Sequence, residues 1–235
     1  MTSPNPDTRS STLWIGLLVV VVLLGIVAVV VAKSGSDDKA KKEEGSASAL
    51  VSAQKGGCDA VPAADISTDT SLSPFDSATD DPALCQTIPT IKGKDLDGKP
   101  LTIGKADGKA KLILFVAHWC PHCQREVPLI TAHLKTDPMP SDVELLSVST
   151  NVQPQADNYP PKTWLDTVGW PAPVLADTAK NDFATKYGLT SFPYFLVVDA
   201  KGRVVYRNAG ELDMGSFDLL VKAAQTGKPP SLEGS

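Results

Sequence analysis

The pattern of hydrophobic and polar residues changes at about Pro89, where a folded domain is expected to begin. Short apolar runs at 112–117 and 143–148 predict strands that are buried on both faces. Between them, apolar residues at helical spacing predict a helix over 120–135, with Pro128 inside it as a source of a kink. A strand, a helix and a second strand in this order predict a parallel strand pair.

Turn signals and further periodic stretches extend this pattern in both directions. Asp97-Gly98 and Ala200-Lys201-Gly202 are typical of the turns of two hairpins. The other expected elements are strands 90–94 and 100–103, helices 162–168 and 179–187, strands 194–199 and 203–208, and helix 216–226. With the two helices between 162 and 187 taken as one helical region, the order from the first buried strand onward is β, α, β, α, β, β, α, so the fold class is α/β, a mixed sheet with helices on both faces.

An uncharged apolar stretch precedes the domain. Residues 13–32 are long enough to cross a bilayer as a helix, which rises about 1.5 Å per residue. A cleaved secretory signal is the alternative, and Val30 and Ala32 offer a passable cleavage pattern, but the apolar region of such a signal runs only about 7–15 residues. We therefore expect a transmembrane anchor at 13–32, preceded by a short tail at 1–12.

The remaining sequence divides into a linker, an irregular segment, the domain and a tail. Residues 33–56 are rich in Lys, Glu, Asp, Ala, Ser and Gly, and they predict a flexible charged linker. Residues 57–88 contain many Pro, Ser, Thr and Asp residues and predict a mostly irregular segment bounded by Cys58 and Cys85. The domain is expected over 89–229, with a C-terminal tail at 230–235.

Charge and cysteine content restrict the class of protein and its compartment. The formal net charge of -5 argues against a nucleic-acid partner, which would require a basic face. An even cysteine count after a membrane segment suits an oxidising compartment, so we expect a Cys58–Cys85 disulfide, with two free thiols as the alternative. This pairing predicts a single-pass protein of the cell membrane with an extracytoplasmic domain. The positive-inside rule opposes that topology, because only Arg9 precedes the anchor whereas four lysines follow it: Lys33, Lys39, Lys41 and Lys42.

The sequence Trp119-Cys120-Pro121-His122-Cys123 lies where a buried strand passes into a helix. Unpaired N–H groups and the helix dipole favour an anion at Cys120, and the thiolate is the attacking species in disulfide exchange. His122 can add a hydrogen bond or a positive charge, and Cys123, one turn further on, suits a less exposed resolving thiol. Zinc is the alternative, but structural zinc sites usually use four ligands and the chain has no second CxxC pair.

The stretch LILFVAHWCPHCQREVPL resembles the active-site region of thioredoxin-fold disulfide oxidoreductases, most closely the membrane-tethered TlpA/ResA-like branch. The resemblance extends over about residues 89–227 and includes DLDGKPLTI, GWPAPVLADTAKNDFATKYGL and SFPYFLVVDAKGRVV. It implies a thioredoxin fold and disulfide exchange with protein substrates. No organic cofactor is implied.

The resemblance also assigns roles to individual residues. Cys120 matches the family's nucleophile and Cys123 its resolving thiol. Pro193, after Phe192, matches a cis-proline that faces the disulfide and helps to bind substrate backbone, although an ordinary trans proline is the alternative. Glu126 matches the acid of the CxxCxxExP pattern, thought to assist proton transfer, or else is a solvated charge on the helix surface.

Two flanking residues complete the expected site. Trp119 is expected to pack beside the redox pair and, with Phe192, to contact the substrate. His118 is expected either to border the active site or to be a polar surface residue. His133 is too far along the helix from Cys120 to form a Cys–His hydrolase pair.

Two departures from the family pattern affect the expected chemistry. Leu114 occupies a position that carries a buried acid in many relatives, which leaves proton handling to Glu126 or His122. The Pro121-His122 dipeptide is that of the disulfide-forming DsbA family, whereas the surrounding sequence is similar to the reducing branch, so an oxidant is slightly favoured.

Three further interpretations follow. The expected partners are the thiols or disulfides of exported proteins and a membrane redox partner that resets the active site. Binding of Cu(I) by Cys120, Cys123 and a nearby His is the alternative function, since soft thiolates suit that ion. A thiol peroxidase is disfavoured because Ala117 stands where such enzymes usually carry Thr.

Overall fold

The computed structural model describes residues 56–61, 71–104 and 106–230. The expected N-terminal tail, the anchor and the linker before Gly56 lie outside these residues, as does most of the C-terminal tail. Among the described residues, no helix has both the length and the apolar character needed to cross a bilayer.

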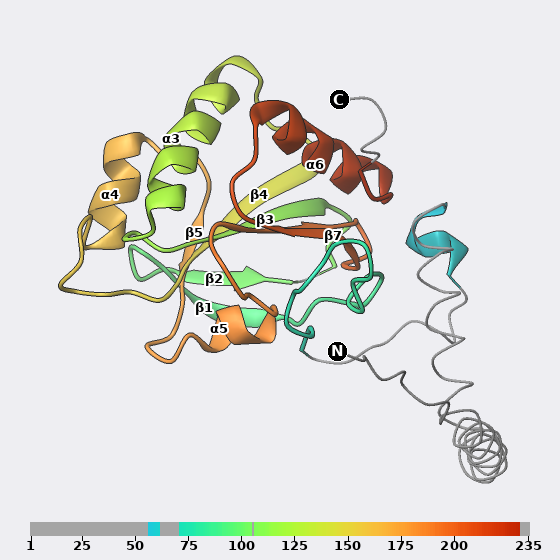
Figure 1. Ribbon diagram of the computed structural model, residues 1–235, viewed down its shortest axis with the longest axis horizontal. Helices are drawn as coiled ribbons and strands as arrows, with labels where there is room; N and C mark the ends of the chain where they lie inside the picture. Colours follow the sequence, from blue (N-terminus) through green and yellow to red (C-terminus); the bar gives the residue numbers. More distant parts are fainter. Residues whose placement is uncertain (1–55, 62–70, 105, 231–235) are drawn as a thin grey trace, which may run out of the picture. The chain divides into compact units, whose positions relative to one another are not determined.

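A seven-stranded mixed sheet forms the centre of the described domain (Figure 1), in the order β2-β1-β5-β4-β3-β6-β7. The strands are β1 (Ile91–Asp95), β2 (Pro100–Ile103), β3 (Ala110–Val116), β4 (Val143–Ser149), β5 (Val174–Ala176), β6 (Tyr194–Val198) and β7 (Val204–Ala209). Strands β3, β4 and β5 are parallel to one another, which confirms the predicted strand–helix–strand unit, and β6 runs antiparallel beside β3.

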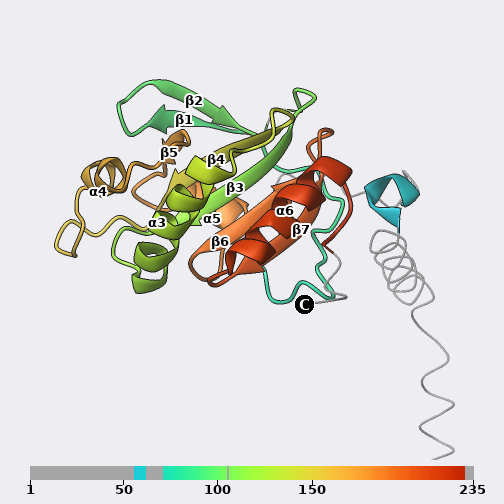
Figure 2. The same ribbon diagram turned by 90° about the horizontal axis from the view of Figure 1, so that it is seen from above.

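Helices cover both faces of this sheet. They are α3 (Pro121–Thr136), α4 (Pro161–Val168), α5 (Asp182–Lys186) and α6 (Met214–Thr226). Figures 1 and 2 show α3, α4 and α6 over one face, with α5 on the other. The arrangement is the thioredoxin-like α/β fold that the sequence predicts.

Alternate residues of β3 supply the two hydrophobic cores. Leu112 and Leu114 pack with the buried faces of α3, α4 and α6, whereas Ile113 and Phe115 pack with the opposite layer. A strand buried on both faces has this appearance because successive side chains point to opposite sides of the sheet. The polar alternation of a half-exposed strand is therefore missing from this part of the sequence.

The segment 71–88 is irregular, as expected, but it is not a loose loop. Leu72, Phe75 and Ile88 are buried in the core on the face that carries α5. Backbone hydrogen bonds join Leu72 to Lys186 and Phe75 to Gly188, both at 2.8 Å. The segment therefore acts as part of the covering layer on that face.

The structure corrects two details of the predicted elements. The helix predicted over 179–187 is only α5, because the chain before it forms a turn in which Asp177 accepts N–H groups from Phe183 and Ala184. The sequence prediction also lacked β5, whose three residues join β4 to β1. Helix α3 continues past Pro128 to Thr136.

Candidate active site

The two cysteines of the CPHC sequence lie at the junction of β3 and α3. Cys120 is the N-cap residue of α3 and Pro121 occupies its first turn, where a missing N–H costs no hydrogen bond. Cys123 follows within that turn and is fully buried, whereas Cys120 retains 5% exposure. Both are free thiols in this structure. Both thiols are therefore buried, and Cys120 is slightly the more exposed of the two.

Burial dominates the acid–base behaviour of Cys123. It raises the pKa of this thiol far above its ordinary value, and the neighbouring Cys120 and the charge of Glu126 add to the effect. A hydrogen bond from the backbone of Ala117 opposes the shift only in part. Cys123 is therefore protonated at neutral pH in the reduced state, so it must lose a proton before it can attack.

Glu126 lies one turn beyond Cys123 and is almost completely buried. Its Oε1 accepts a 2.7 Å hydrogen bond from the amide of Leu212, and its Oε2 has no hydrogen-bond partner. Burial raises the pKa of this carboxyl to about 7, against the opposing hydrogen bond from Leu212. The interpretation of Glu126 as a solvated surface charge is therefore wrong, and the residue can exchange a proton near neutral pH.

His122 is exposed and turns toward the loop that follows β7. Its Nδ1 lies 2.7 Å from Oε1 of Glu211 and 2.8 Å from Nη2 of Arg125. Arg125 also forms an ion pair with Glu211. The sequence analysis did not identify Glu211 because 89 residues separate it from His122, and no local spacing indicates the contact.

A second group of side chains comes from Trp119, which precedes Cys120, and from the residues directly before β6. The Phe192–Pro193 peptide bond is cis, and β6 begins directly after it, beside the end of β3. The ring of Trp119 meets that of Phe192 edge-on, with 6.0 Å between the centroids. The Trp119 indole N–H also donates a 2.7 Å hydrogen bond to the carbonyl of Asn151. Pro193, Phe192 and Trp119 thus lie at the same end of the sheet as the cysteines.

His118 is fully buried, so its interpretation as a polar surface residue is wrong. Its Nε2 accepts a hydrogen bond from the Gln153 amide, and its Nδ1 lies 2.8 Å from the carbonyl oxygen of Asp157. These two contacts require a proton on Nδ1 and a lone pair on Nε2. His118 therefore fastens the loop after β4 to the strand end that precedes Trp119, and both of its ring nitrogens are occupied.

The other two cysteines are joined at the opposite end of the sheet. Cys58 and Cys85 form a disulfide, and both are buried. The amide of Cys85 donates to the carbonyl of Val204, at the start of β7. Val204 pairs with Val198, which in turn pairs with Lys111 near the start of β3. Because these cysteines are bonded to each other, they are not available as ligands of a four-cysteine zinc site.

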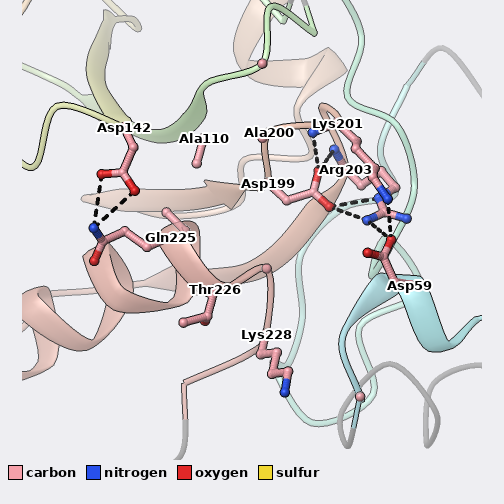
Figure 3. A pocket seen from close by; sticks show the side chains of 14 residues that line it. Asp59, Ala110, Asp142, Asp199, Ala200, Lys201, Arg203, Gln225, Thr226 and Lys228 are labelled. Carbon is pink, nitrogen blue, oxygen red and sulfur yellow. Dashed lines mark hydrogen bonds and ion pairs between the residues drawn. The ribbon is translucent and has the colours of Figure 1, made fainter.

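Salt bridges connect a short 3-10 helix, Cys58–Ala60, to the turn between β6 and β7. Asp59 accepts hydrogen bonds from Nζ of Lys201 and Nη2 of Arg203, each at 2.7 Å, and Asp199 binds Arg203 from the other side (Figure 3). A hollow of about 410 Å³ lies beside these groups, and Asp142 and Gln225 also line it. It belongs to the end of the domain that is remote from Cys120.

His133 behaves as expected from its position. It lies on α3, well beyond the cysteines, and its Nε2 is 2.7 Å from Oδ1 of Asp218. Asp137 completes a surface group whose possible ligand atoms lie within 4.8 Å of one another. This group is separate from the cysteine pair.

Comparison with known proteins places the chain in a family. Residues 84–219 match the redoxin family. The chain is 34% identical to the thiol:disulfide interchange protein HelX of Rhodobacter capsulatus over 107 residues, which are 45% of this chain and 55% of HelX. It is 26% identical to the thiol-disulfide oxidoreductase ResA of Bacillus thuringiensis over 123 residues, which are 52% of this chain and 68% of ResA.

One solved structure is also similar to this chain in sequence. The thiol:disulfide interchange protein of Chlorobium tepidum is 29% identical, and the match covers 60% of this chain and 97% of that one, with a TM-score of 0.49. The match to HelX, by contrast, spans only about half of that relative's length. Since the redoxin match extends over more than half of the sequence and includes both cysteines of the CPHC site, this chain belongs to the redoxin family.

Proposed function

We propose that this protein is a thiol:disulfide oxidoreductase of the ResA/HelX type that works through Cys120 and Cys123. The observation that carries the proposal is the unequal placement of the two thiols, with Cys120 at the helix N-cap and Cys123 fully buried behind it. The names of the matched relatives point to the same activity. Protein thiols and disulfides are accordingly the proposed substrates.

The chemistry in the oxidising direction consists of two exchanges. A substrate thiolate attacks the sulfur of Cys120, forms a mixed disulfide and breaks the Cys120–Cys123 bond, so that Cys123 leaves with the electron pair. Burial of Cys123 favours its rapid protonation, and Glu126, with a pKa of about 7, is the acid placed to supply the proton. A second substrate thiolate then attacks its partner sulfur in the mixed disulfide, which releases Cys120 and leaves the enzyme reduced.

The reducing direction uses the same groups in reverse. Cys120 attacks a substrate disulfide, Glu126 accepts the proton of Cys123, and the Cys123 thiolate then attacks the sulfur of Cys120 to release the reduced substrate. In this direction the loss of the Cys123 proton is the demanding step, since burial opposes the thiolate. Either direction requires a redox partner that resets the pair, and we propose a membrane protein for that role.

We favour the oxidising direction because of the Pro121-His122 dipeptide. His122 lies in the first turn of α3, two residues from Cys120, and a charge there favours the thiolate of the reduced enzyme. A stabilised reduced form makes the disulfide a stronger oxidant. The difference in burial between the two sulfurs is compatible with both directions, so the dipeptide alone carries this preference.

The reduction potential of the Cys120–Cys123 couple tests the activity and its direction together. The full chain in detergent is equilibrated with glutathione buffers, and the reduced fraction is read by thiol alkylation and mass shift, with Cys123→Ser as the control that cannot form the disulfide. A potential well above that of glutathione supports a disulfide donor. A value near or below about -270 mV, that of thioredoxin, supports a reductant. The absence of a measurable couple would overturn the proposed activity.

We also propose that the domain lies outside the cytoplasm and is tethered by residues 13–32. The buried Cys58–Cys85 disulfide supports this topology, since such bonds persist in oxidising compartments. The lysines after the apolar stretch oppose it. Reporters fused after Ser235, one active only outside the cytoplasm and one only inside, decide between the two. Activity of the cytoplasmic reporter alone would contradict the proposal.

The alternative function, Cu(I) binding, gains no third ligand from His118. Both ring nitrogens of His118 are occupied, and Nδ1 of His122 contacts Glu211. Cys120 and Cys123, with at most Nε2 of His122 as a third ligand, would have to hold the ion. Stoichiometric copper in the purified protein together with slow disulfide exchange would favour this alternative over the redox activity.

A further inference from the structure

The chain between β4 and α4 forms a loop, residues 150–160, that is fastened to the two residues before Cys120 (Figure 1). Hydrogen bonds join this loop to the indole of Trp119, to both ring nitrogens of His118 and to the His118 carbonyl. Their partners in the loop are the Asn151 carbonyl, the Gln153 amide, the Asp157 carbonyl and the Asn158 side chain. The loop is therefore held against the chain that leads into the attacking cysteine.

The start of the loop is also tied to the sheet and to the turn before α5. The Thr150 amide donates a 3.0 Å hydrogen bond to the carbonyl of Val116, the last residue of β3, and the Thr150 hydroxyl donates to Asp177 at 2.6 Å. The Asn151 amide donates to the side chain of Asn181 at 2.9 Å. A loop fixed at these points presents its side chains in a defined arrangement, so a ligand that binds it does not have to order it first.

Two large hydrophobic side chains of this loop are exposed. Val152 is 44% exposed and Tyr159 is 49% exposed, and they are two of the four exposed large hydrophobic residues in the described part of the chain. Val152 follows the residue whose carbonyl binds the Trp119 indole, and the ring of Tyr159 lies 6.0 Å from that of His118. Half of the exposed large hydrophobic residues therefore lie in the one loop that is fastened beside Cys120.

The loop is almost free of charge. Asp157 carries the only charged side chain in residues 150–160. The charged side chains of Arg125 and Glu211 contact His122 instead, from α3 and from the loop after β7. An uncharged surface with exposed apolar side chains favours apolar groups of a ligand over charged ones.

A protein substrate must pass close to this loop. Cys120 is only 5% exposed, and the Cα atoms of two disulfide-bonded cysteines lie about 5.5–6 Å apart. The residues on either side of the substrate cysteine are therefore brought against the groups that surround Cys120. Trp119 and the loop fastened to it are among these groups.

We propose that Val152 and Tyr159 form a docking surface for apolar side chains next to the reacting cysteine of a protein substrate. The proposal rests on the redox activity proposed above and specifies its substrate class. Contact with these two residues removes apolar surface of both partners from water, which favours a mixed disulfide with such a segment over one with a small thiol. Because apolar residues are mostly buried in folded proteins, the preferred substrate is an unfolded, extended segment.

The test uses two peptides, each with two cysteines, which are flanked by leucines in one peptide and by serines in the other. The oxidised full chain in detergent takes two electrons and two protons from the peptide dithiol, which becomes a cyclic disulfide, and exchange is followed in the direction that the potential of the couple favours. We expect the wild type to exchange about tenfold faster with the leucine peptide than with the serine peptide. Rates with dithiothreitol, which has no side chains to bind, correct for effects on the cysteine pair itself.

The double substitution Val152→Ser and Tyr159→Ser should lower this preference to about twofold. Because the same peptides are used, their intrinsic difference in reactivity cancels between wild type and variant. Val152→Ser alone, which keeps the Tyr159 ring against His118, should already lower the preference by about threefold, so a folding defect in the double variant does not decide the result. The matched control is Leu129→Ser, which removes another exposed apolar side chain from the cysteine-bearing helix and should leave the preference unchanged.

The possible results separate this inference from the proposed function. A wild type without preference for the leucine peptide, a preference that both serine variants retain, or an equal loss in Leu129→Ser would overturn the docking surface while leaving the redox activity intact. A wild-type chain that exchanges with neither peptide nor with dithiothreitol would instead overturn the proposed function.

Discussion

Arg207 of β7 and Asp81 of the irregular segment form a bidentate ion pair that is closed to solvent. The Arg207 side chain is 0% exposed and that of Asp81 is 3% exposed. One contact, from Nε of Arg207 to Oδ2 of Asp81, measures 2.7 Å, and the same guanidinium also donates to the carbonyl of Ser73. It further lies 5.2 Å from the centre of the Phe75 ring. The pair thus joins the segment before β1 to the far edge of the sheet.

Removal of one member of this pair should be costly. Asp81→Ala leaves the buried Arg207 without its partner, and such changes destabilise proteins by about 3–5 kcal/mol. Denaturant unfolding of the variant and the wild type measures the difference. Lys162→Met, which removes an exposed ion pair with Asp97, should leave the unfolding midpoint nearly unchanged. If Asp81→Ala and Lys162→Met lower the unfolding free energy by equally small amounts, the burial of Arg207 does not determine the loss of stability.

Glu126 makes stability depend on pH in a direction opposite to that of most carboxyls. Its folded pKa of about 7 lies above the ordinary value of 4.5, so between these values the folded chain binds a proton that the unfolded chain does not. Stability therefore falls as pH rises from about 4.5 to 7, by roughly 3 kcal/mol for a shift of this size.

The Glu126→Gln variant provides the test of this pH dependence. The amide carries no titrating group, so the variant should lose this fall in stability, and the unfolding free energy of the wild type should decrease relative to that of the variant between pH 5 and pH 8. Unfolding curves at several pH values measure the difference. In the same variant, the pH dependence of disulfide exchange between pH 6 and 8 should flatten. If the unfolding free energy depends on pH in the same way in the wild type and in Glu126→Gln, the raised pKa of Glu126 is contradicted.

The Cys58–Cys85 disulfide is expected to stabilise the domain without setting the redox activity. It closes a loop with a sequence separation of 27, for which chain entropy predicts a contribution of about 3.5 kcal/mol. Replacement of both cysteines by Ser should lower the unfolding free energy by about that amount. The potential of the Cys120–Cys123 couple should stay the same. A shifted potential would mean that the two cysteine pairs are coupled through the sheet.

His118 should control the order of the loop after β4. His118→Ala removes the hydrogen-bond partner of the Gln153 amide and of the Asp157 carbonyl, and each such hydrogen bond contributes about 0.5–1.5 kcal/mol. We expect faster proteolytic cleavage within 151–159 and a lower melting temperature. Gln225→Ala, which breaks a hydrogen bond with the exposed Asp142, is a control for the loss of a side-chain contact elsewhere. Cleavage at the wild-type rate would show that His118 does not hold the loop.

The sequence was most informative where function depends on neighbours in the chain. The strand run before Cys120 and the helical spacing after it together predicted β3, α3 and the position of the cysteine pair. Local spacing also placed Cys123 on the buried side of the helix. These features follow from residues within one strand and one helix, so one-dimensional periodicity contains them.

The sequence contained no comparable local pattern for contacts between segments that lie far apart in the chain. Glu211, which contacts His122, and Asp81, which pairs with Arg207, are ordinary acidic residues in polar stretches. The sequence did not determine whether Glu126 is buried, for the same reason, because its solvent exposure depends on the distant loop that carries Leu212. Strand β5 was missed because three residues are too few to show a period, and its pairing with β4 and β1 is what defines it.

The position of the Cys58–Cys85 bond has a consequence for the maturation of the protein. This bond lies by the start of β3, and the redox cysteines follow the end of that strand, so the seven residues of β3 separate the two pairs by about 20 Å. Both sulfurs of the structural pair are also closed to solvent. A folded molecule therefore cannot use its own CPHC site to form or repair this bond. The bond must therefore form before the domain closes over it.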